Sequence, residues 1–436
     1  MASLQVGDAR LARRRNGLPF EPDRSAPLPM RILRSPLTWA LFIATVVFAA
    51  LLYDQYLLIT SNADAVADVV PVITFTAVRQ AALYALPTLA FWCLVFVLVD
   101  RFRPARPALW YIALGWGGCV ATWLSLIAND WASVKLGIEQ FGGDAAAQVR
   151  MAVFVAPFVE EACKATVLFW LAILARQRIV SKLSMITLGG LSAAGFAFTE
   201  NVIYYCRAIV YASGTIDVGD ANEAVMQTVW MRGFYTCFGH PLFTAFTGIG
   251  IAVALRTRSK VVRVLAPLVG FGAAALCHML FNSQASLQSE EGLQLLYFLV
   301  VLPSLLGLVI ALVRQELAQG RLIKARLTDY VRMGWLEQSD PVAFSRLRSR
   351  FRALLLAALR GWRPWLATYR MQRAMTELAY LRDAEARGVV DEGGDVRAQE
   401  LVRAIRTWRP EAVDDPSGVK LGMPRPIRQL LARVRR

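Results

Sequence analysis

The sequence predicts an all-α membrane protein, a polytopic bundle of about eight transmembrane helices followed by a small helical cytoplasmic domain. Hydrophobic residues make up 56% of the 436 residues and charged residues only 18%, whereas soluble chains hold about 45–50% apolar and about 25% charged residues. Eight apolar stretches are long enough to cross a bilayer, and Lys and Arg gather in the two tails and in alternate loops. This composition argues against a soluble enzyme and against a disordered scaffold.

The charge distribution divides the chain into three parts. Residues 1–36 hold seven Arg and three acidic residues, and residues 314–436 hold 25 Lys and Arg and 14 acidic residues. Residues 37–313 are hydrophobic and almost neutral. We therefore predict a basic cytoplasmic N-terminal tail, a transmembrane domain and a basic helical cytoplasmic domain, in that order.

Each predicted span is an apolar stretch close to the length of about 20 residues that crosses ~30 Å of hydrocarbon. The first stretch begins after Pro36 and is the shortest. The eight spans cover about 37–53, 81–99, 108–128, 151–175, 183–205, 235–255, 264–282 and 295–313.

The connections between these spans alternate between basic and non-basic along the whole chain. Arg101, Arg103 and Arg106 mark one basic loop, for example, whereas Glu290 and Glu291 mark a loop without Lys or Arg. Because Lys and Arg are enriched in cytoplasmic loops, the basic tails place both termini in the cytoplasm.

The tail after Arg314 has helical spacing near 342–361, 365–387 and 396–408. A basic cluster occupies every second position of one stretch, at Arg346, Arg348, Arg350 and Arg352. For a segment next to a membrane we favour contact with anionic lipid headgroups. A solvated face is the alternative, and binding to nucleic acid is disfavoured.

Polar side chains inside the fourth to seventh spans are the candidates for function, because ionisable groups are costly within a membrane. Both histidines of the chain lie in these spans. The candidate catalytic residues are Glu160, Glu161, Lys164, Glu200, Asn201, His240, His278 and Asn282.

These groups fall at a similar depth. With a rise of ~1.5 Å per residue, Glu160 lies ~15 Å from the outer end of its helix, and Glu200, His240 and His278 lie ~8–9 Å from theirs. Unrelated polar residues would scatter through the bilayer. We therefore predict one polar chamber in its outer half, reached by water from the extracytoplasmic side.

A carboxylate, two imidazoles and an amide suit hydrolysis of a peptide bond. Glu160 is our candidate general base, with Lys164 tuning either Glu160 or Glu161, because two adjacent acids disfavour joint ionisation. His278 and Asn282 share a helix face and are suited to stabilising an oxyanion. Alternatively, Glu160, His240 and His278 hold Zn²⁺, which acidifies its bound water.

The same residues also allow interpretations in which they have structural roles only. Glu160, Glu161 and Lys164 suit a structural ion pair, and each histidine suits an interhelical hydrogen bond. Cys237 and His240 have metal-ligand spacing, but we favour Cys237 as a core residue. At the level of the whole chain, the alternatives to a protease are a proton-coupled transporter and a non-catalytic membrane scaffold.

Four motifs in order resemble those of the PrsW family of intramembrane proteases, which is related to the CAAX-prenyl-protease and Abi superfamily. They are Glu160-Glu161-x-x-Lys164, Phe196-x-x-x-Glu200-Asn201, His240 with Gly248, and His278-x-x-x-Asn282. The resemblance covers about residues 36–313. It implies a bacterial plasma-membrane endopeptidase that cuts other membrane proteins, such as single-span anti-sigma factors.

The resemblance also implies roles for particular residues. The first glutamate, Glu160, would activate water, and His278 with Asn282 would support the oxyanion. The wider superfamily often has His in the second motif, where this chain has Glu200-Asn201, so His240 and Glu200 both remain candidate partners of the base. The family is often labelled metalloprotease, yet a two-histidine site also suits a metal-free glutamate route, towards which we lean.

Overall fold

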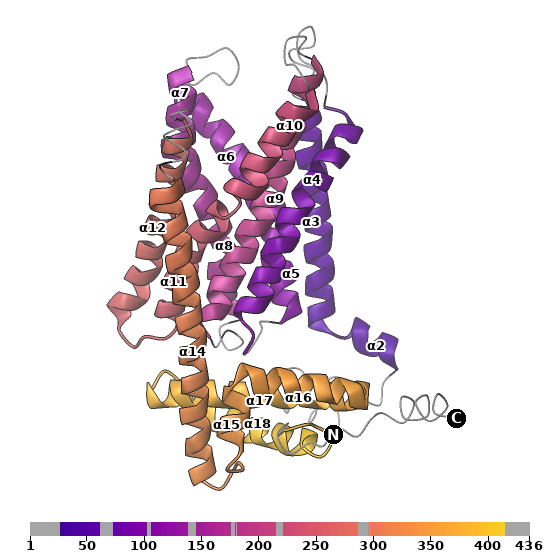
Figure 1. Cartoon of the computed structure of the whole chain (residues 1–436), viewed down its shortest axis with the longest axis vertical. Coiled ribbons are helices and arrows are strands. Elements are labelled where there is room, and N and C mark those ends of the chain that lie inside the picture. The colour runs from indigo at the N-terminus through magenta and orange to yellow at the C-terminus, as the bar shows by residue number, and fades with distance from the viewer. Residues whose placement is uncertain are drawn as a thin grey trace, which may run out of the picture. The chain divides into compact units, whose positions relative to one another are not determined.

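The computed structural model describes residues 27–61, 73–102, 106–137, 145–175, 179, 181–214, 221–286, 295 and 297–414. These residues form helices joined by short connections and contain no strand (Figure 1). The predicted all-α membrane bundle is thereby confirmed.

The helices of the first part of the chain include three π-helical segments, which are labelled η. They are α2 (Leu28–Leu33), α3 (Pro36–Ser61), α4 (Phe75–Val99), α5 (Pro107–Gly115), η2 (Trp116–Ala121), α6 (Thr122–Lys135), α7 (Ala145–Arg150), η3 (Met151–Val155), α8 (Ala156–Leu174), α9 (Lys182–Gly214), α10 (Ala221–Trp230), η5 (Met231–Tyr235), α11 (Gly239–Ala254) and α12 (Lys260–Ser286). The remainder comprises η6 (Tyr297–Val301), α14 (Leu302–Arg332), α15 (Asp340–Ser345), α16 (Leu347–Arg360), α17 (Trp362–Ala386) and α18 (Gly394–Trp408).

Five helical stretches among the described residues are long and apolar enough to cross a membrane. They are Pro36–Thr60, Phe75–Val99, Pro107–Lys135, Asn222–Ala254 and Lys260–Ser283. The chain is therefore a multi-pass membrane protein. The other three predicted spans are also helical, in α8, α9 and η6–α14, but they are not among the five. In α8 the charged side chains of the candidate site reduce the apolar character, so the number eight stays a prediction.

The described residues divide into two compact units. The larger unit contains residues 27–100 and 106–307, and the smaller contains Arg101, Phe102 and residues 308–414. The sequence placed the start of the cytoplasmic domain at residue 314 and contained no sign that Arg101 and Phe102, from the connection between α4 and α5, would pack with it.

In the larger unit, α9 is the central helix and packs against α4, α5, η2, α8, α10 and α11. Small residues permit this close approach. A Cβ at Gly195 would collide with the carbonyl oxygen of Leu114, and one at Gly117 would collide with that of Ser192. The helices consequently meet backbone to backbone, as is common in membrane bundles.

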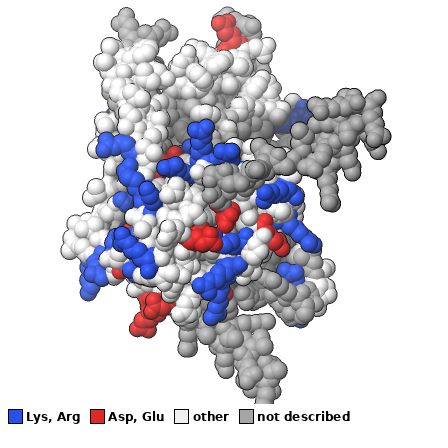
Figure 2. Space-filling view, turned by 60° about the horizontal axis from the view of Figure 1, so that its bottom comes forward, with Lys and Arg blue, Asp and Glu red and all other residues white. Residues whose placement is uncertain are grey.

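The smaller unit has its own core, formed by α14, α15, α17 and α18 around Leu327, Phe344, Met371 and Leu378. Phe102 is 3% exposed and belongs to this core. Figure 2 shows Lys and Arg side chains outnumbering Asp and Glu on the viewed face of the molecule.

One member of the predicted basic cluster is buried rather than available to a lipid surface. Arg350 is 6% exposed, and its guanidinium donates to the carbonyl oxygen of Phe102 (2.7 Å) and to Thr376 Oγ1 (2.7 Å). Burial lowers the pKa of Arg350 to about 10, so the side chain is still charged at neutral pH. The sequence expectation for Arg350 was therefore wrong, because the i, i+2 spacing puts alternate arginines on different sides of a helix.

Candidate active site

The eight predicted site residues come from four helices of the larger unit. α8 carries Glu160, Glu161 and Lys164, and α9 carries Glu200 and Asn201. His240 lies in the first turn of α11, and α12 carries His278 and Asn282. Six of these eight side chains, all except the two asparagines, form one continuous cluster through contacts of 3.9 Å or less.

The interior of the cluster is a dry ion pair. Lys164 Nζ lies 2.6 Å from Glu161 Oε1, and neither side chain is exposed. Thr244 Oγ1 donates to Glu161 Oε2 (2.7 Å), and His278 Nδ1 lies 3.1 Å from Glu161 Oε1. The sequence left open which glutamate pairs with Lys164, and the structure pairs it with Glu161. Each oxygen of Glu161 is engaged, so this carboxylate has no room to act on a substrate.

Glu160, unlike Glu161, has a carboxylate oxygen without a hydrogen-bond partner among the described residues. This atom, Oε2, is buried. The nearest groups are His278 Nε2 at 3.8 Å and Lys164 Nζ at 3.9 Å. Both distances are too long for a hydrogen bond, but a water molecule lying beside Glu160 Oε2 and His278 Nε2 could reach both atoms at about 2.8 Å. Of the two adjacent glutamates, Glu160 is therefore the one with a buried carboxylate oxygen that lacks a hydrogen-bond partner among the described residues.

The tautomer of His240 follows from its neighbours. His240 Nδ1 lies 3.0 Å from the Lys164 ammonium group, which can only donate, so Nδ1 must accept. The other ring nitrogen, Nε2, therefore carries the hydrogen and donates to Glu200 Oε2 (2.7 Å). His240 thus links the ion pair of α8 to the carboxylate of α9.

Glu200 and Asn201 are held by an arginine that the sequence did not single out. Arg232, in η5, donates to Glu200 Oε2 (2.8 Å) and to Asn201 Oδ1 (3.0 Å). Its guanidinium also lies 3.8 Å from the centre of the Tyr204 ring. A π-helical turn places Arg232 here, and such turns are frequent at functional sites.

Aromatic rings fix the positions of the two imidazoles. The ring of Phe243 stacks on that of His278, with centroids 5.0 Å apart and planes 22° apart. The two imidazoles meet edge to face at 5.1 Å. Phe196 covers the Lys164 ammonium group at 4.4 Å, which suits a cation–π contact.

Asn282 contacts a neighbouring helical segment. Its Nδ2 atom donates to the carbonyl oxygen of Ala152 (2.9 Å) and so ties α12 to η3. Cys237 does not belong to the group of candidate metal ligands among the described residues, and its carbonyl oxygen accepts a hydrogen bond from Trp92 (2.9 Å).

Accessibility distinguishes an outer from an inner part of the cluster. The side chains of Glu160, His240 and Glu200 are 11%, 15% and 18% exposed, whereas those of Glu161 and Lys164 are fully buried. A substrate would therefore meet the cluster on its Glu160–His240–Glu200 side.

A metal ion fits this cluster only in part. Glu160, His240 and His278 each offer one ligand atom, and these atoms lie within 4.8 Å of one another. The Glu and His donor set is one that Zn²⁺ uses. However, both ring nitrogens of His240 are already within hydrogen-bond distance of Lys164 and Glu200. Only Glu160 and His278 offer ligand atoms without such a contact, and His240 would have to give up a partner to become the third ligand.

Sequence reasoning missed Arg232 and Thr244. Thr244 lies four residues after His240, so a helical-face argument from that histidine would have found it. Arg232 had no comparable signal, because an arginine just before a predicted span looks like an ordinary residue of the membrane–water interface.

A family comparison covers the same region. Residues 105–308 match the model of a family described as PrsW family intramembrane metalloprotease. No curated protein and no solved structure matched the chain. The matched segment contains all eight candidate site residues. Residues 105–308 are therefore similar to the PrsW family of intramembrane proteases.

Proposed function

We propose that the chain is an endopeptidase that hydrolyses peptide bonds of membrane proteins near the outer face of the bilayer, with Glu160 as the general base. The observation that carries this proposal is the buried, unpartnered Oε2 atom of Glu160, which faces His278 Nε2 across 3.8 Å. A single water molecule lying beside these two atoms and bonded to both would be poised to lose a proton to the carboxylate.

The steps of the reaction follow from the positions of these groups. Glu160 takes a proton from the water, whose oxygen attacks the carbonyl carbon of the scissile bond. The carboxyl group of Glu160 then gives that proton to the departing amine as the C–N bond breaks. His278 and Asn282 are the proposed donors to the oxyanion.

The remaining residues hold these groups in position. Glu161 accepts from His278 Nδ1 and turns Nε2 of that ring towards Glu160. Lys164 and Thr244 hold Glu161. Glu200 and Arg232 hold His240 through Glu200 Oε2. The sequence left His240 and Glu200 as candidate partners of the general base, Glu160. Neither residue contacts Glu160 directly, and both act through Lys164.

We favour the metal-free form of this chemistry. The Lys164 ammonium group already supplies a positive charge 3.9 Å from Glu160 and 3.0 Å from His240, where it would repel a divalent cation. The alternative is Zn²⁺ held by Glu160, His240 and His278, which when bound would acidify a water ligand. That form requires His240 to release Lys164 or Glu200.

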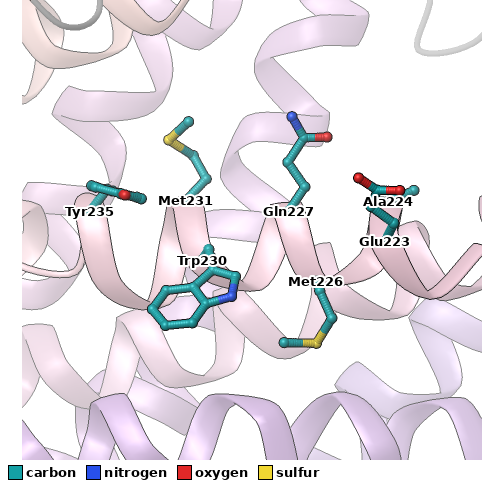
Figure 3. A pocket seen from close by; sticks show the side chains of 7 residues that line it. All are labelled: Glu223, Ala224, Met226, Gln227, Trp230, Met231 and Tyr235. Atoms are coloured by element: carbon teal, nitrogen blue, oxygen red, sulfur yellow. The ribbon is translucent and has the colours of Figure 1, made fainter.

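The route of the substrate is proposed from a pocket on α10 and η5. An open pocket runs along α10 and η5 and is lined by Met226, Gln227, Trp230, Met231 and their neighbours (Figure 3). Arg232, which contacts Glu200, follows Met231 in the chain. We propose that a segment of a membrane-protein substrate approaches along this pocket, and that single-span proteins resembling anti-sigma factors are candidates.

We further propose a location and an orientation. The alternation of basic loops supports a multi-pass protein of the bacterial plasma membrane with both termini in the cytoplasm. The cluster would then open towards the extracytoplasmic side.

A second candidate function is proton-coupled transport. Glu200, His240, Lys164, Glu161 and His278 form an unbroken chain of contacts of 3.1 Å or less, and such chains also serve as proton relays. Proton-driven solute uptake into liposomes without cleavage of any protein would support this alternative.

Protein N-termini separate the two candidates. Membranes of cells that carry the wild-type chain are compared with membranes that carry the Glu160→Gln variant at equal abundance. Hydrolysis predicts new N-termini of membrane proteins that appear only with the wild type, located near the outer ends of their spans. Identical N-termini in both membranes would contradict the proposed function.

A further inference from the structure

An exposed apolar stripe runs along α16 in the smaller unit. Phe351, Leu355 and Leu359 are 70%, 53% and 49% exposed, and their spacing of four residues puts them on one face of the helix. Trp362, at the start of α17, is 69% exposed. A soluble domain seldom exposes large apolar side chains in such a row, and a contiguous patch of this kind marks an interaction site.

Arginines accompany this stripe. Arg348 and Arg352 are exposed on the same face of α16, and Arg360 and Arg363 are exposed near its end. Residues 341–376 contain eight Arg and no Asp, Glu or Lys. The partner of this face should therefore offer both apolar and negatively charged groups.

The opposite face of α16 fixes the orientation of the helix. Ala353, Leu356 and Ala357 are buried there and pack with Trp365 and Val413. Arg350, on the same buried side, bonds to Phe102 and Thr376. The apolar stripe cannot turn inwards without breaking these contacts.

We propose that the exposed face of α16 lies in the interface of an anionic lipid bilayer. An amphipathic helix that combines apolar residues with arginine gains from apolar burial and from attraction to anionic headgroups. The smaller unit begins within α14, the helix that also carries the last predicted span, so it is tethered at a membrane. A nucleic acid would match the arginines and leave the aliphatic side chains of Leu355 and Leu359 in water.

Photocrosslinking in the full-length chain tests this proposal. Phe351 is replaced by p-benzoylphenylalanine, a residue of similar shape, and the chain is reconstituted into liposomes of phosphatidylcholine with or without phosphatidylglycerol. After irradiation, mass spectrometry identifies what is attached at position 351. We expect a phospholipid adduct, in greater yield when phosphatidylglycerol is present.

Two comparisons sharpen the test. The same crosslinker at Val396, which is 44% exposed on α18, should give no lipid adduct. The double change Arg348→Gln and Arg352→Gln should weaken association of this face with the anionic surface by roughly 30-fold, because each basic residue contributes about 1 kcal/mol there. The adduct yield at position 351 in anionic liposomes should therefore fall. An adduct to another protein, an adduct to a peptide of this chain, or equal lipid yields at positions 351 and 396 would overturn the proposal.

Discussion

At the scale of single residues, two adjacent glutamates have opposite environments. Glu161 accepts from Lys164, Thr244 and His278, whereas Glu160 Oε2 has no hydrogen-bond partner among the described residues. The difference arises because residues i and i+1 of a helix point about 100° apart. The carboxylate of Glu161 thus holds the cluster together, and that of Glu160 is the one proposed to react.

This contrast predicts different effects of two isosteric changes on stability. Glu161→Gln leaves the buried Lys164 ammonium group without its closest counter-charge and should lower the free energy of unfolding by about 3–5 kcal/mol. Glu160→Gln should change it by less than about 1 kcal/mol, because no hydrogen bond to Oε2 is lost. Unfolding by sodium dodecyl sulfate in mixed micelles measures both. Equal destabilisation by the two changes would contradict this assignment.

Arg232 is the second residue on which the site depends. It holds Glu200 and Asn201 together, and Glu200 in turn fixes His240. Arg232→Met should reduce kcat for cleavage by roughly 100-fold with a smaller change in KM, because misplaced groups at a reacting centre cost rate. Arg232→Lys should restore part of the activity by restoring the charge.

Arg207 provides the matched control for Arg232. Both guanidinium groups lie over the ring of Tyr204, at 3.8 Å for Arg232 and 5.9 Å for Arg207. No contact of Arg207 with Glu200 occurs among the described residues, so Arg207→Met should leave kcat unchanged. Equal losses in the two methionine variants would show that the ring contact, rather than the bond to Glu200, matters.

At the scale of elements, the close packing of α9 determines where Glu200 lies. Gly195 is one turn and one residue before Glu200, and the space beside it is filled by the carbonyl oxygen of Leu114. Adding a side chain there must push α9 away from α5. The packing of a backbone without a Cβ therefore contributes to the geometry of the site.

Two glycine-to-alanine changes test this packing. Gly195→Ala should destabilise the protein by about 1–3 kcal/mol or more, as overpacking of a close contact does. Gly272→Ala, in α12, has nothing within 4 Å of the added methyl group and should be neutral or stabilising by up to about 1 kcal/mol. Thermal unfolding in detergent measures the two shifts, and a Gly195→Ala variant as stable as the wild type would refute the packing argument.

The elements also show how far the sequence could predict the site. Glu160, His240 and His278 were recognisable because ionisable residues are rare in apolar spans, and helical geometry set their approximate depth. The contacts of Asn282 with Ala152 and of Arg232 with Glu200 were not predictable in this way. They depend on the π-helical segments η3 and η5, which shift side-chain directions and leave no compositional signal.

At the scale of the whole molecule, the core of the smaller unit includes Phe102, a residue of the connection between α4 and α5. Phe102 is 3% exposed among Ile323, Met375 and their neighbours, and its carbonyl oxygen accepts from Arg350. The sequence could not predict that Phe102 belongs to this core, because a lone Phe between arginines has no periodicity.

Shortening Phe102 should loosen the smaller unit. Phe102→Ala removes a buried ring and should destabilise that unit by about 3–5 kcal/mol. Met333→Ala, at a side chain that is 46% exposed, should change stability by no more than about 0.5 kcal/mol. Hydrogen exchange of the peptides from α17 in the full-length chain reports the difference, and unchanged exchange in Phe102→Ala would contradict this role.

Cleavage by the purified chain tests the central claim most directly. The wild type, Glu160→Gln and Glu337→Gln, a control whose side chain is 60% exposed, are reconstituted with a membrane-anchored reporter, with and without a zinc chelator. We predict that the wild type and Glu337→Gln cut the reporter, that Glu160→Gln is slower by about 10²–10⁴-fold, and that the chelator has no effect. Loss of wild-type cleavage with the chelator would refute the metal-free route, and undiminished cleavage by a folded Glu160→Gln variant would contradict the whole account.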